Sequence, residues 1–136
     1  MTKKTLRAQC LEAIQLRARL THADDHGLCI CVSCGIRQHY KEMDGGHYIP
    51  KGNSSYWALE IENVHPQCKG CNGFGMKYGI AAQQYTNWMV DYYGREFVNT
   101  MLATKSNIRK LYKADYVEML DDFKKTIKEN KLRIGE

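Results

Sequence analysis

The sequence has no long hydrophobic run, and this absence excludes a membrane-spanning protein. No apolar stretch approaches the roughly 18 residues that a transmembrane helix needs, so no membrane partner is expected. The first residues, MTKKTLRAQCLEAIQ, carry two lysines but lack the continuous apolar segment of a secretory signal. A cytoplasmic protein is therefore the expectation.

Internal repeats and low-complexity segments are also absent, and there are only two prolines. The 136 residues suit one domain, and a composition with 43% apolar and 26% charged residues predicts a folded protein rather than a disordered one. Both prolines, most glycines and five of the six cysteines fall within residues 28–80. We predict a single domain over residues 1–136, with an N-terminal helix at 5–20, a core of short strands and turns at 28–80, and a helical region at 81–136.

Acidic residues are missing from the stretch FVNTMLATKSNIRKLYKA, residues 97–114, although the whole chain has a net charge of only +5. Uncompensated positive charge favours a polyanion such as DNA. The alternative is a helix whose charged face is simply solvated. If the patch binds DNA, the expected contacts are Lys105, Arg109, Lys110 and Lys113.

The spacing of apolar residues predicts further helical segments after the cysteine-rich region, at 83–93, at 95–104 and at about 108–131. Gly94 is expected to end the first of these. Residues 57–64, WALEIENV, alternate well enough to predict a strand. In the last helix an apolar stripe predicts the buried face, formed by Tyr112, Tyr116, Met119, Leu120, Phe123 and Ile127.

Six cysteines in a cytoplasmic chain are more often metal ligands or free thiols than disulfides. Two pairs have the same C-x-x-C spacing, and each is followed by a glycine or a small polar turn. Together they supply four thiolates for a tetrahedral zinc ion, and such a closed set is structural rather than catalytic. We therefore predict a structural Zn²⁺ that stabilises a region too polar to form a large core alone, held by Cys31, Cys34, Cys68 and Cys71.

The segment CICVSC offers a third thiol, Cys29, as a competing partner of Cys31. A C-x-C turn is a poorer chelate, and only Cys31 with Cys34 mirrors the second pair. Cys10 and Cys29 are therefore expected to be buried as small apolar residues. A redox dithiol would need a βαβ pattern around one reactive pair, and that pattern is absent.

Thirty-three residues separate Cys34 from Cys68, against the roughly 15–20 of a simple zinc ribbon. The insert contains DGGHYIP, in which two glycines before His47 permit a sharp turn and close approach of a ligand. Asn63 and Asn72 stand near its far end and directly after the second cysteine pair. Among the other histidines, His65 is expected to shape the cysteine knuckle, and three are expected at the surface, namely His22, His26 and His39.

The order of these motifs resembles that of the His-Asn-His (HNH, ββα-metal) endonucleases. The matching segments are GGHYIP, ENVHPQC and CKGCN, followed by Lys77. More closely, it resembles the phage recombination nucleases of the NinG/Rap type, in which C-x-x-C-G, D-x-G-H-Y and N-x-H-x-Q-C-x-x-C-N recur in this order. The resemblance is tight from Cys31 to Asn72 and loose beyond. It implies an α+β fold with a zinc-stabilised ββα-metal (His-Me finger) nuclease core flanked by N-terminal and C-terminal helices.

The resemblance also implies a role for each matching residue. His47 would be the general base that activates water, and Asn63 would orient it or brace the hairpin. Asn72 would help hold a catalytic Mg²⁺ or Mn²⁺, and it would also suit a helix N-cap. Relatives with the simpler motif carry an acid directly before the histidine, where this chain has Gly46. Asp44 shares strand parity with position 46, so Asp44 is the expected second ligand.

These expectations describe a metal-dependent DNA endonuclease selective for branched recombination intermediates, such as a Holliday junction or a D-loop. It would act in the host-cell cytoplasm if the chain is phage-encoded. Lys51 and Lys77 are added to the expected DNA contacts, and a homodimer would suit symmetric cleavage of two strands. Two alternatives stay open, a general nicking or restriction-type HNH nuclease and a non-catalytic zinc-ribbon DNA-binding module.

Overall fold

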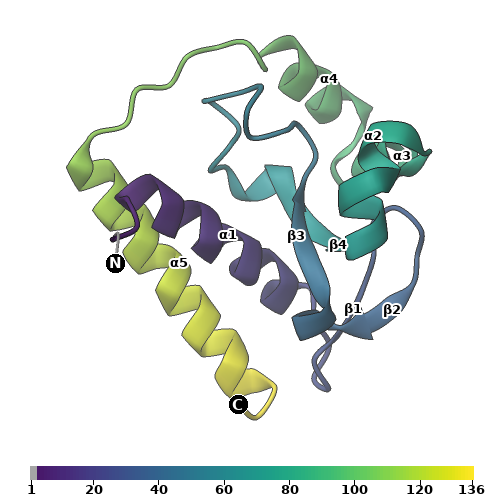
Figure 1. Ribbon diagram of the computed structural model, residues 1–136, viewed down its shortest axis with the longest axis horizontal. Coiled ribbons are helices and arrows are strands. Elements are labelled where there is room, and N and C mark those ends of the chain that lie inside the picture. The colour runs from purple at the N-terminus through teal and green to yellow at the C-terminus, as the bar shows by residue number, and fades with distance from the viewer. Residues whose placement is uncertain (1–2) are drawn as a thin grey trace.

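The computed structural model describes residues 3–136 and has an α+β architecture, in which helices surround two small antiparallel sheets (Figure 1). The predicted α+β class is therefore confirmed. None of the helices in the described residues is both long and apolar enough to cross a membrane. The elements, in chain order, are α1 (Leu6–Thr21), β1 (Leu28–Ile30), β2 (Arg37–His39), η1 (Tyr40–Glu42), β3 (Met43–His47), η2 (Ile61–Asn63), β4 (Val64–Cys68), η3 (Cys71–Gly75), α2 (Met76–Tyr78), α3 (Ala81–Tyr93), α4 (Arg95–Ala103) and α5 (Lys113–Arg133).

Helix α1 lies between α5 and the hairpin formed by β3 and β4 (Figure 1). The Thr5 hydroxyl starts the helix by accepting a hydrogen bond from the Ala8 amide at 3.1 Å, a typical N-cap. The helix buries Cys10 and Ile14 completely. The predicted helix at 5–20 is therefore confirmed, and so is the expectation that Cys10 packs as an apolar residue.

Helices α3 and α4 meet at Gly94, whose φ of 92° lies in the left-handed region that favours glycine. The predicted end of the first segment at Gly94 is confirmed. The α4 helix ends at Ala103, where the Thr104 hydroxyl donates to the Thr100 carbonyl at 2.7 Å.

The prediction that the last helix starts near residue 108 is wrong, because α5 begins at Lys113. Residues 104–112 instead form a linker that crosses from α4 to α5 (Figure 1). Its middle is held on the loop between β3 and β4: the Arg109 amide donates to the Ser55 hydroxyl at 3.1 Å, and its guanidinium pairs with Glu60. Tyr112 is 62% exposed, so it does not belong to the buried stripe that Leu120 and Phe123 form against α1.

The predicted strand over residues 57–64 is also wrong, since residues 57–60 form a turn, η2 follows, and β4 occupies Val64–Cys68. Tertiary contacts explain the difference. The indole of Trp57 donates to the Thr104 hydroxyl at 3.0 Å and so points toward the end of α4. Trp57 is buried in the cluster with α3 and α4, and Leu59 in the cluster with α1 and α5, so their alternation does not report a strand.

The hairpin of β3 and β4 pairs residue for residue, from Met43 opposite Cys68 to His47 opposite Val64, with no bulge at the glycines. Alternation along β3 therefore holds, and Asp44 and Gly46 share one face. The other face approaches α1 so closely that a Cβ on Gly45 would lie 2.6 Å from the Cα of Gln15. Glycine at position 45 is what allows α1 to pack on this strand.

Within residues 3–136 the core consists of three apolar clusters, and residues 28–80 contribute to each of them by packing against helices. One joins α1, α5 and β4, a second joins the loop after β3 to α3 and α4, and a third surrounds the end of α1 and β1. The cysteine-rich region therefore depends on the helices for its apolar burial, as its polar composition indicates.

Candidate functional site

The four predicted zinc ligands lie together, with their Sγ atoms all within 4.8 Å of one another. The Sγ atoms of Cys34 and Cys68, one from each pair, are 3.8 Å apart. Zinc–sulfur bonds of about 2.3 Å in a tetrahedron place two sulfurs roughly 3.8 Å apart. The cluster of Cys31, Cys34, Cys68 and Cys71 can therefore hold a metal ion such as zinc.

Each cysteine pair is shaped as a knuckle by its own backbone. The Cys34 amide donates to the Cys31 sulfur at 3.5 Å, and the Cys71 amide donates to the Cys68 sulfur at 3.4 Å. Cys29 stands outside this arrangement: it is buried, its Sγ lies 3.1 Å from the Met43 sulfur, and burial raises the pKa of its thiol to about 11. The expectation of an apolar role for Cys29 is consistent with this position.

The first knuckle is also fixed to β4 and α3. The Val32 amide donates to the Pro66 carbonyl at 3.0 Å, and the Ser33 hydroxyl donates to the Ala81 carbonyl at 2.8 Å. A metal ion in the cluster would therefore join β1, β4 and the turn that starts α3.

His47 and Asn72 line one cavity of about 230 Å³, although they come from different elements. His47 ends β3, and Asn72 lies in the π-helical turn η3 that follows the second knuckle. Lys51 lines the same cavity together with Gln15 from α1. Three residues that the sequence analysis placed in the site are thus brought together, whereas Asp44 does not line this cavity.

The ring of His47 is held in one orientation by the backbone. Its Nε2 lies 2.8 Å from the Ala58 carbonyl oxygen, which can only accept, so Nε2 carries the proton. In the neutral ring Nδ1 is then the nitrogen that can take up a proton. Burial lowers the pKa of His47, and the nearby charges of Lys51 and Arg7 act in the same direction. The imidazole is therefore neutral at neutral pH, and Nδ1 is available to accept a proton.

Asp44 and Asn72 contact each other directly. The Asn72 amide donates to Asp44 Oδ2 at 3.0 Å, and the Lys69 ammonium donates to Oδ1 at 2.7 Å. Burial alone would raise the pKa of Asp44, but these hydrogen bonds and the charges of Lys69 and Arg19 hold it below its usual range. Asp44 is therefore a carboxylate at neutral pH.

The reading of Asn72 as a helix N-cap is wrong. The residue before η3 is Gly70, which has helical dihedral angles, and no side chain caps this end. Asn72 lies inside the turn, and its side chain reaches Asp44 instead. Short π-helical turns of this kind occur frequently at functional sites.

Asn63 braces the loop between the strands and does not reach the cavity. It is fully buried; its Oδ1 accepts from the Ile49 amide at 2.8 Å, and its Nδ2 donates to the carbonyls of Ile49 and Trp57 at 2.9 and 3.1 Å. This loop also carries Ala58, whose carbonyl orients His47. Of the two roles expected for Asn63, the structure places it as a brace.

Gln67 is a buried polar residue that the sequence analysis did not assign to the site. It is the strand partner of Asp44, and its Nε2 donates to the Ser33 hydroxyl at 3.0 Å. Its Oε1 has no hydrogen-bond partner among residues 3–136. That atom lies 1.9 Å from the place where a Cβ on Gly46 would be. In the sequence, its only signal was its place in the motif ENVHPQC, to which no role was attached.

His65 belongs to a buried hydrogen-bond chain that ends at the strand carrying His47. The Tyr85 hydroxyl donates its proton to the Gly46 carbonyl at 2.7 Å. Its oxygen therefore accepts a hydrogen bond from His65 Nδ1, which lies 2.9 Å away. His65 Nε2 then accepts from the Tyr93 hydroxyl at 2.7 Å. Burial, with a smaller effect of His22, lowers the pKa of His65 to about 3, so this ring stays neutral.

Two of the other histidines differ from the expectation of surface positions. His26 is exposed, but His22 and His39 are half-buried. His22 packs its ring 5.5 Å from that of His65 and 6.1 Å from that of Trp88. The aromatic residues of α3 around these two rings were expected to pack in the core. Their contacts with His22 explain why this residue is half-buried.

The predicted DNA contacts form two separate groups. Lys51 and Lys77 lie near Asn72, the first in the cavity and the second on α2, and both are exposed. The others lie on the linker and at the start of α5, where Arg109 is already paired with Glu60. The side chains of the remaining three are exposed, namely Lys105, Lys110 and Lys113.

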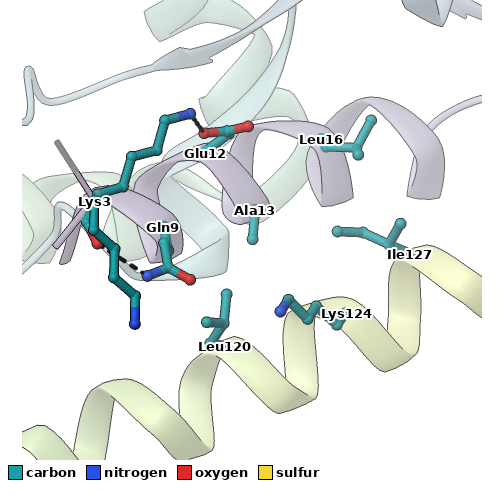
Figure 2. A pocket seen from close by; sticks show the side chains of 9 residues that line it. Lys3, Gln9, Glu12, Ala13, Leu16, Leu120, Lys124 and Ile127 are labelled. Atoms are coloured by element: carbon teal, nitrogen blue, oxygen red, sulfur yellow. Dashed lines mark hydrogen bonds and ion pairs between the residues drawn. The ribbon is translucent and has the colours of Figure 1, made fainter. Parts of the chain in front are cut away.

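A second cavity, of about 500 Å³, lies between α1 and α5 (Figure 2). It is lined by apolar residues such as Leu16 and Ile127, with Lys3 and Lys124 at its edge. Glu12, which also lines it, is paired with Lys4. This cavity shares no residue with the one that His47 lines, and it holds no histidine or cysteine.

Comparison with known proteins identifies the family of the chain. No curated protein and no solved structure resembles the chain closely enough to count as a relative. Residues 3–133, however, match the family described as bacteriophage lambda NinG protein. Because this match spans nearly the whole chain, including both cysteine pairs, the cavity and α5, the chain belongs to the NinG family.

Proposed function

We propose that this protein is a metal-dependent DNA endonuclease that hydrolyses phosphodiester bonds in branched recombination intermediates. The observation that carries the proposal is the state of His47. Its Nε2–H is committed to the Ala58 carbonyl, its pKa is lowered, and it shares a cavity with Asn72. A neutral imidazole with one nitrogen left to accept a proton is what a general base requires.

The arrangement around His47 supports the HNH assignment. A two-stranded hairpin with a histidine at the end of its first strand is followed by a helical segment that carries an asparagine. The cysteine cluster lies where the second strand passes into this segment. In this proposal the zinc is structural: it fixes Asn72 relative to His47 and takes no part in the reaction.

Residues that can hold a catalytic divalent ion fit the chemistry of Mg²⁺ or Mn²⁺. Asp44 is a carboxylate, and it contacts the Asn72 amide, so the oxygen-rich donor set suits a hard cation that keeps several waters. Such an ion, when bound, would polarise the scissile phosphate and stabilise the leaving oxygen. His47 would take the proton of the attacking water at Nδ1, and Lys51 would hold a neighbouring phosphate.

A preference for branched DNA is supported by two exposed aromatic side chains beside the site. Phe74 and Tyr78 are 73% and 71% exposed, and their rings lie 5.1 Å apart. Both follow Asn72 within one helical segment, and Lys77 lies between them in the sequence. Exposed aromatics next to a lysine suit stacking on bases at an interruption of the helical stack, which a branch point offers and a continuous linear duplex does not.

Two alternatives give different results in one experiment. A general nicking or restriction-type nuclease would use the same residues without regard to branching. A zinc-ribbon binding module would bind DNA without cutting it, although it has no use for a neutral histidine oriented in a cavity. Zinc-loaded protein should be incubated with a synthetic four-way junction or with a linear duplex of the same sequence, with and without Mg²⁺.

The proposal expects Mg²⁺-dependent cleavage of the junction and slower cleavage of the duplex. Equal rates on the two substrates would support the general nuclease. Binding without cleavage in Mg²⁺ or Mn²⁺ would refute the proposal and favour the binding module.

A further inference from the structure

The carboxamide of Gln67 is held in one orientation, so its oxygen cannot exchange places with its nitrogen. Its Nε2 donates to the Ser33 hydroxyl, and the proton of that hydroxyl is committed to the Ala81 carbonyl. The end that faces Ser33 must therefore be the donor end. Gln67 is fully buried, and its Oε1 has no hydrogen-bond partner among residues 3–136. A buried acceptor without a partner is costly and calls for an explanation.

The space beside Gly46 brings this oxygen together with a second one. Gln67 Oε1 and Asn72 Oδ1 lie 1.9 Å and 3.0 Å from the position that a Cβ on Gly46 would occupy. The Asn72 amide is also fixed, because its nitrogen donates to Asp44. Two carboxamide oxygens thus converge where residue 46 has no side chain. The Gln67 oxygen fills the place that an acid at position 46 would take.

The carboxylate of Asp44 completes the group. Asp44 and Gln67 are direct partners in the hairpin register, and Asp44 lies on the same face of β3 as Gly46. Three side chains from β3, β4 and η3 therefore present oxygen atoms to one region. Oxygen is the ligand that Mg²⁺ and Mn²⁺ prefer.

Lys69 supplies positive charge to Asp44 in this structure, and its side chain is 68% exposed. Ion pairs formed by such exposed side chains contribute little to stability. A divalent ion can therefore replace the ammonium of Lys69 at little cost, while the exposed lysine turns toward solvent or toward DNA.

We propose that Gln67 is a ligand of the divalent cation, through Oε1, together with Asn72 Oδ1 and the Asp44 carboxylate. This inference rests on the proposed function, but it concerns cation binding and can be tested without DNA. Gln67 lies within the motif ENVHPQC that carries the resemblance, but the resemblance implies no role for it. Cation binding by Gln67 explains why a glutamine is buried with a free oxygen, and why position 46, beside that oxygen, must be a glycine.

The test is Mn²⁺ binding by zinc-loaded protein in the absence of DNA, measured by calorimetry and by the loss of the free-ion signal in electron paramagnetic resonance. Gln67→Met preserves the length of the side chain and removes the oxygen. It should weaken Mn²⁺ binding by about tenfold or more. Gln67→Glu places a charged oxygen at the same point and should bind Mn²⁺ more tightly than the parent. Gln38→Met, the same substitution on half-buried β2, should keep the parent affinity.

Zinc content and the thermal midpoint establish that each variant is folded. Parent affinity in a folded Gln67→Met protein overturns the inference. If Gln67→Met does not fold, Gln67→Glu decides alone, and parent affinity or weaker binding there overturns it. Failure of the proposed function has a different signature, since it appears as a parent protein that binds Mn²⁺ and does not cut the junction.

Discussion

His65 makes the stability of the fold depend on pH. Its pKa is about 3 in the folded protein because the ring is buried, whereas an unfolded chain has the usual value near 6.5. Below a pH of about 6.5 the unfolded state binds a proton that the folded state does not. The free energy of unfolding therefore falls as the pH falls from about 6.5 toward 3. Urea unfolding at pH 7.5 and pH 5.5 should show a loss of about 1.4 kcal/mol from this residue.

His65→Gln should remove that part of the pH dependence, while His26→Gln, a change at an exposed site, should keep it. His22 and His47, whose pKa values are also lowered by burial, would leave a residual dependence of the same sign. If the His65 variant kept the full parental loss between the two pH values, the ring would not be neutral in the folded protein.

Single residues also show what the sequence can and cannot predict about the site. The four cysteines were predictable because each ligand pair lies within four residues and its backbone forms the knuckle locally. Gln67 was not predictable, because its role depends on its partner across the hairpin and on the missing side chain of Gly46. The brace formed by Asn63 likewise depends on a loop fourteen residues upstream.

At the scale of elements, the cysteine cluster joins the two hairpins to the helical turn that carries Asn72. A zinc ion held by four thiolates contributes folding free energy on the order of 10 kcal/mol, comparable to the whole stability of a domain. Cys68→Ala should therefore lose both the zinc, expected at one ion per chain, and the cooperative thermal transition.

Cys29→Ala is the matched control, because that cysteine is buried near the cluster but is not part of it. It should keep one zinc per chain by metal analysis, whatever its effect on stability. A Cys68→Ala protein with full zinc content and an unchanged midpoint would contradict the structural role of the cluster.

The linker between α4 and α5 is the second element with a testable role. Its exposed lysines are free to contact phosphates, whereas Arg109 is needed to hold the linker on the preceding loop. Replacing Lys105 and Lys110 of the linker, together with Lys113 at the start of α5, by alanine should weaken binding to all DNA shapes. It should also lower the slope of log affinity against log salt by about one unit for each phosphate that the variant no longer neutralises.

Fluorescence anisotropy across a range of NaCl concentrations measures this slope. The control removes the same charge from exposed positions of α5 with Lys124, Lys125 and Lys128 changed to alanine. An equal fall in slope for both triple variants would show that the linker is not where DNA binds.

The segment from η3 to α2 supports a third prediction at this scale. Stacking of a base on an aromatic side chain contributes roughly 1–3 kcal/mol. Phe74→Ala with Tyr78→Ala should therefore weaken binding to a four-way junction by about tenfold or more and change duplex binding little. Ile108→Ala, at an 89% exposed position of the linker, is the control. A double variant that still prefers the junction as the parent does would refute the stacking role.

Helix boundaries show why some elements were misread from the sequence. The break at Gly94 was predictable, because a positive φ favours glycine and is a local property. The start of α5 was not, because residues 108–112 have helical spacing but are drawn out by contacts of Arg109 with Ser55 and Glu60. The turn at residues 57–60 was misread as a strand for the same reason: contacts distant in the sequence decided its shape.

At the scale of the whole molecule, the hairpin of β3 and β4 is enclosed on both faces. Helix α1 packs on one face, backed by α5, and α3 covers the other through Tyr85 and His65 (Figure 1). Every residue of β4 from Val64 to Gln67 is buried as a result. The loop end of this hairpin carries His47, and the family match extends over all the layers that hold it.

The central claim is that His47 activates the water that cuts DNA. Single-turnover cleavage of a four-way junction in Mg²⁺ by parent, His47→Ala and His26→Ala proteins tests it most directly. Losing a general base should slow cleavage by about 10²–10⁴-fold. Zinc content and junction affinity should stay unchanged, because the base acts in the transition state. His26→Ala should cut at the parent rate, and a His47→Ala protein that also cuts at the parent rate would contradict the account.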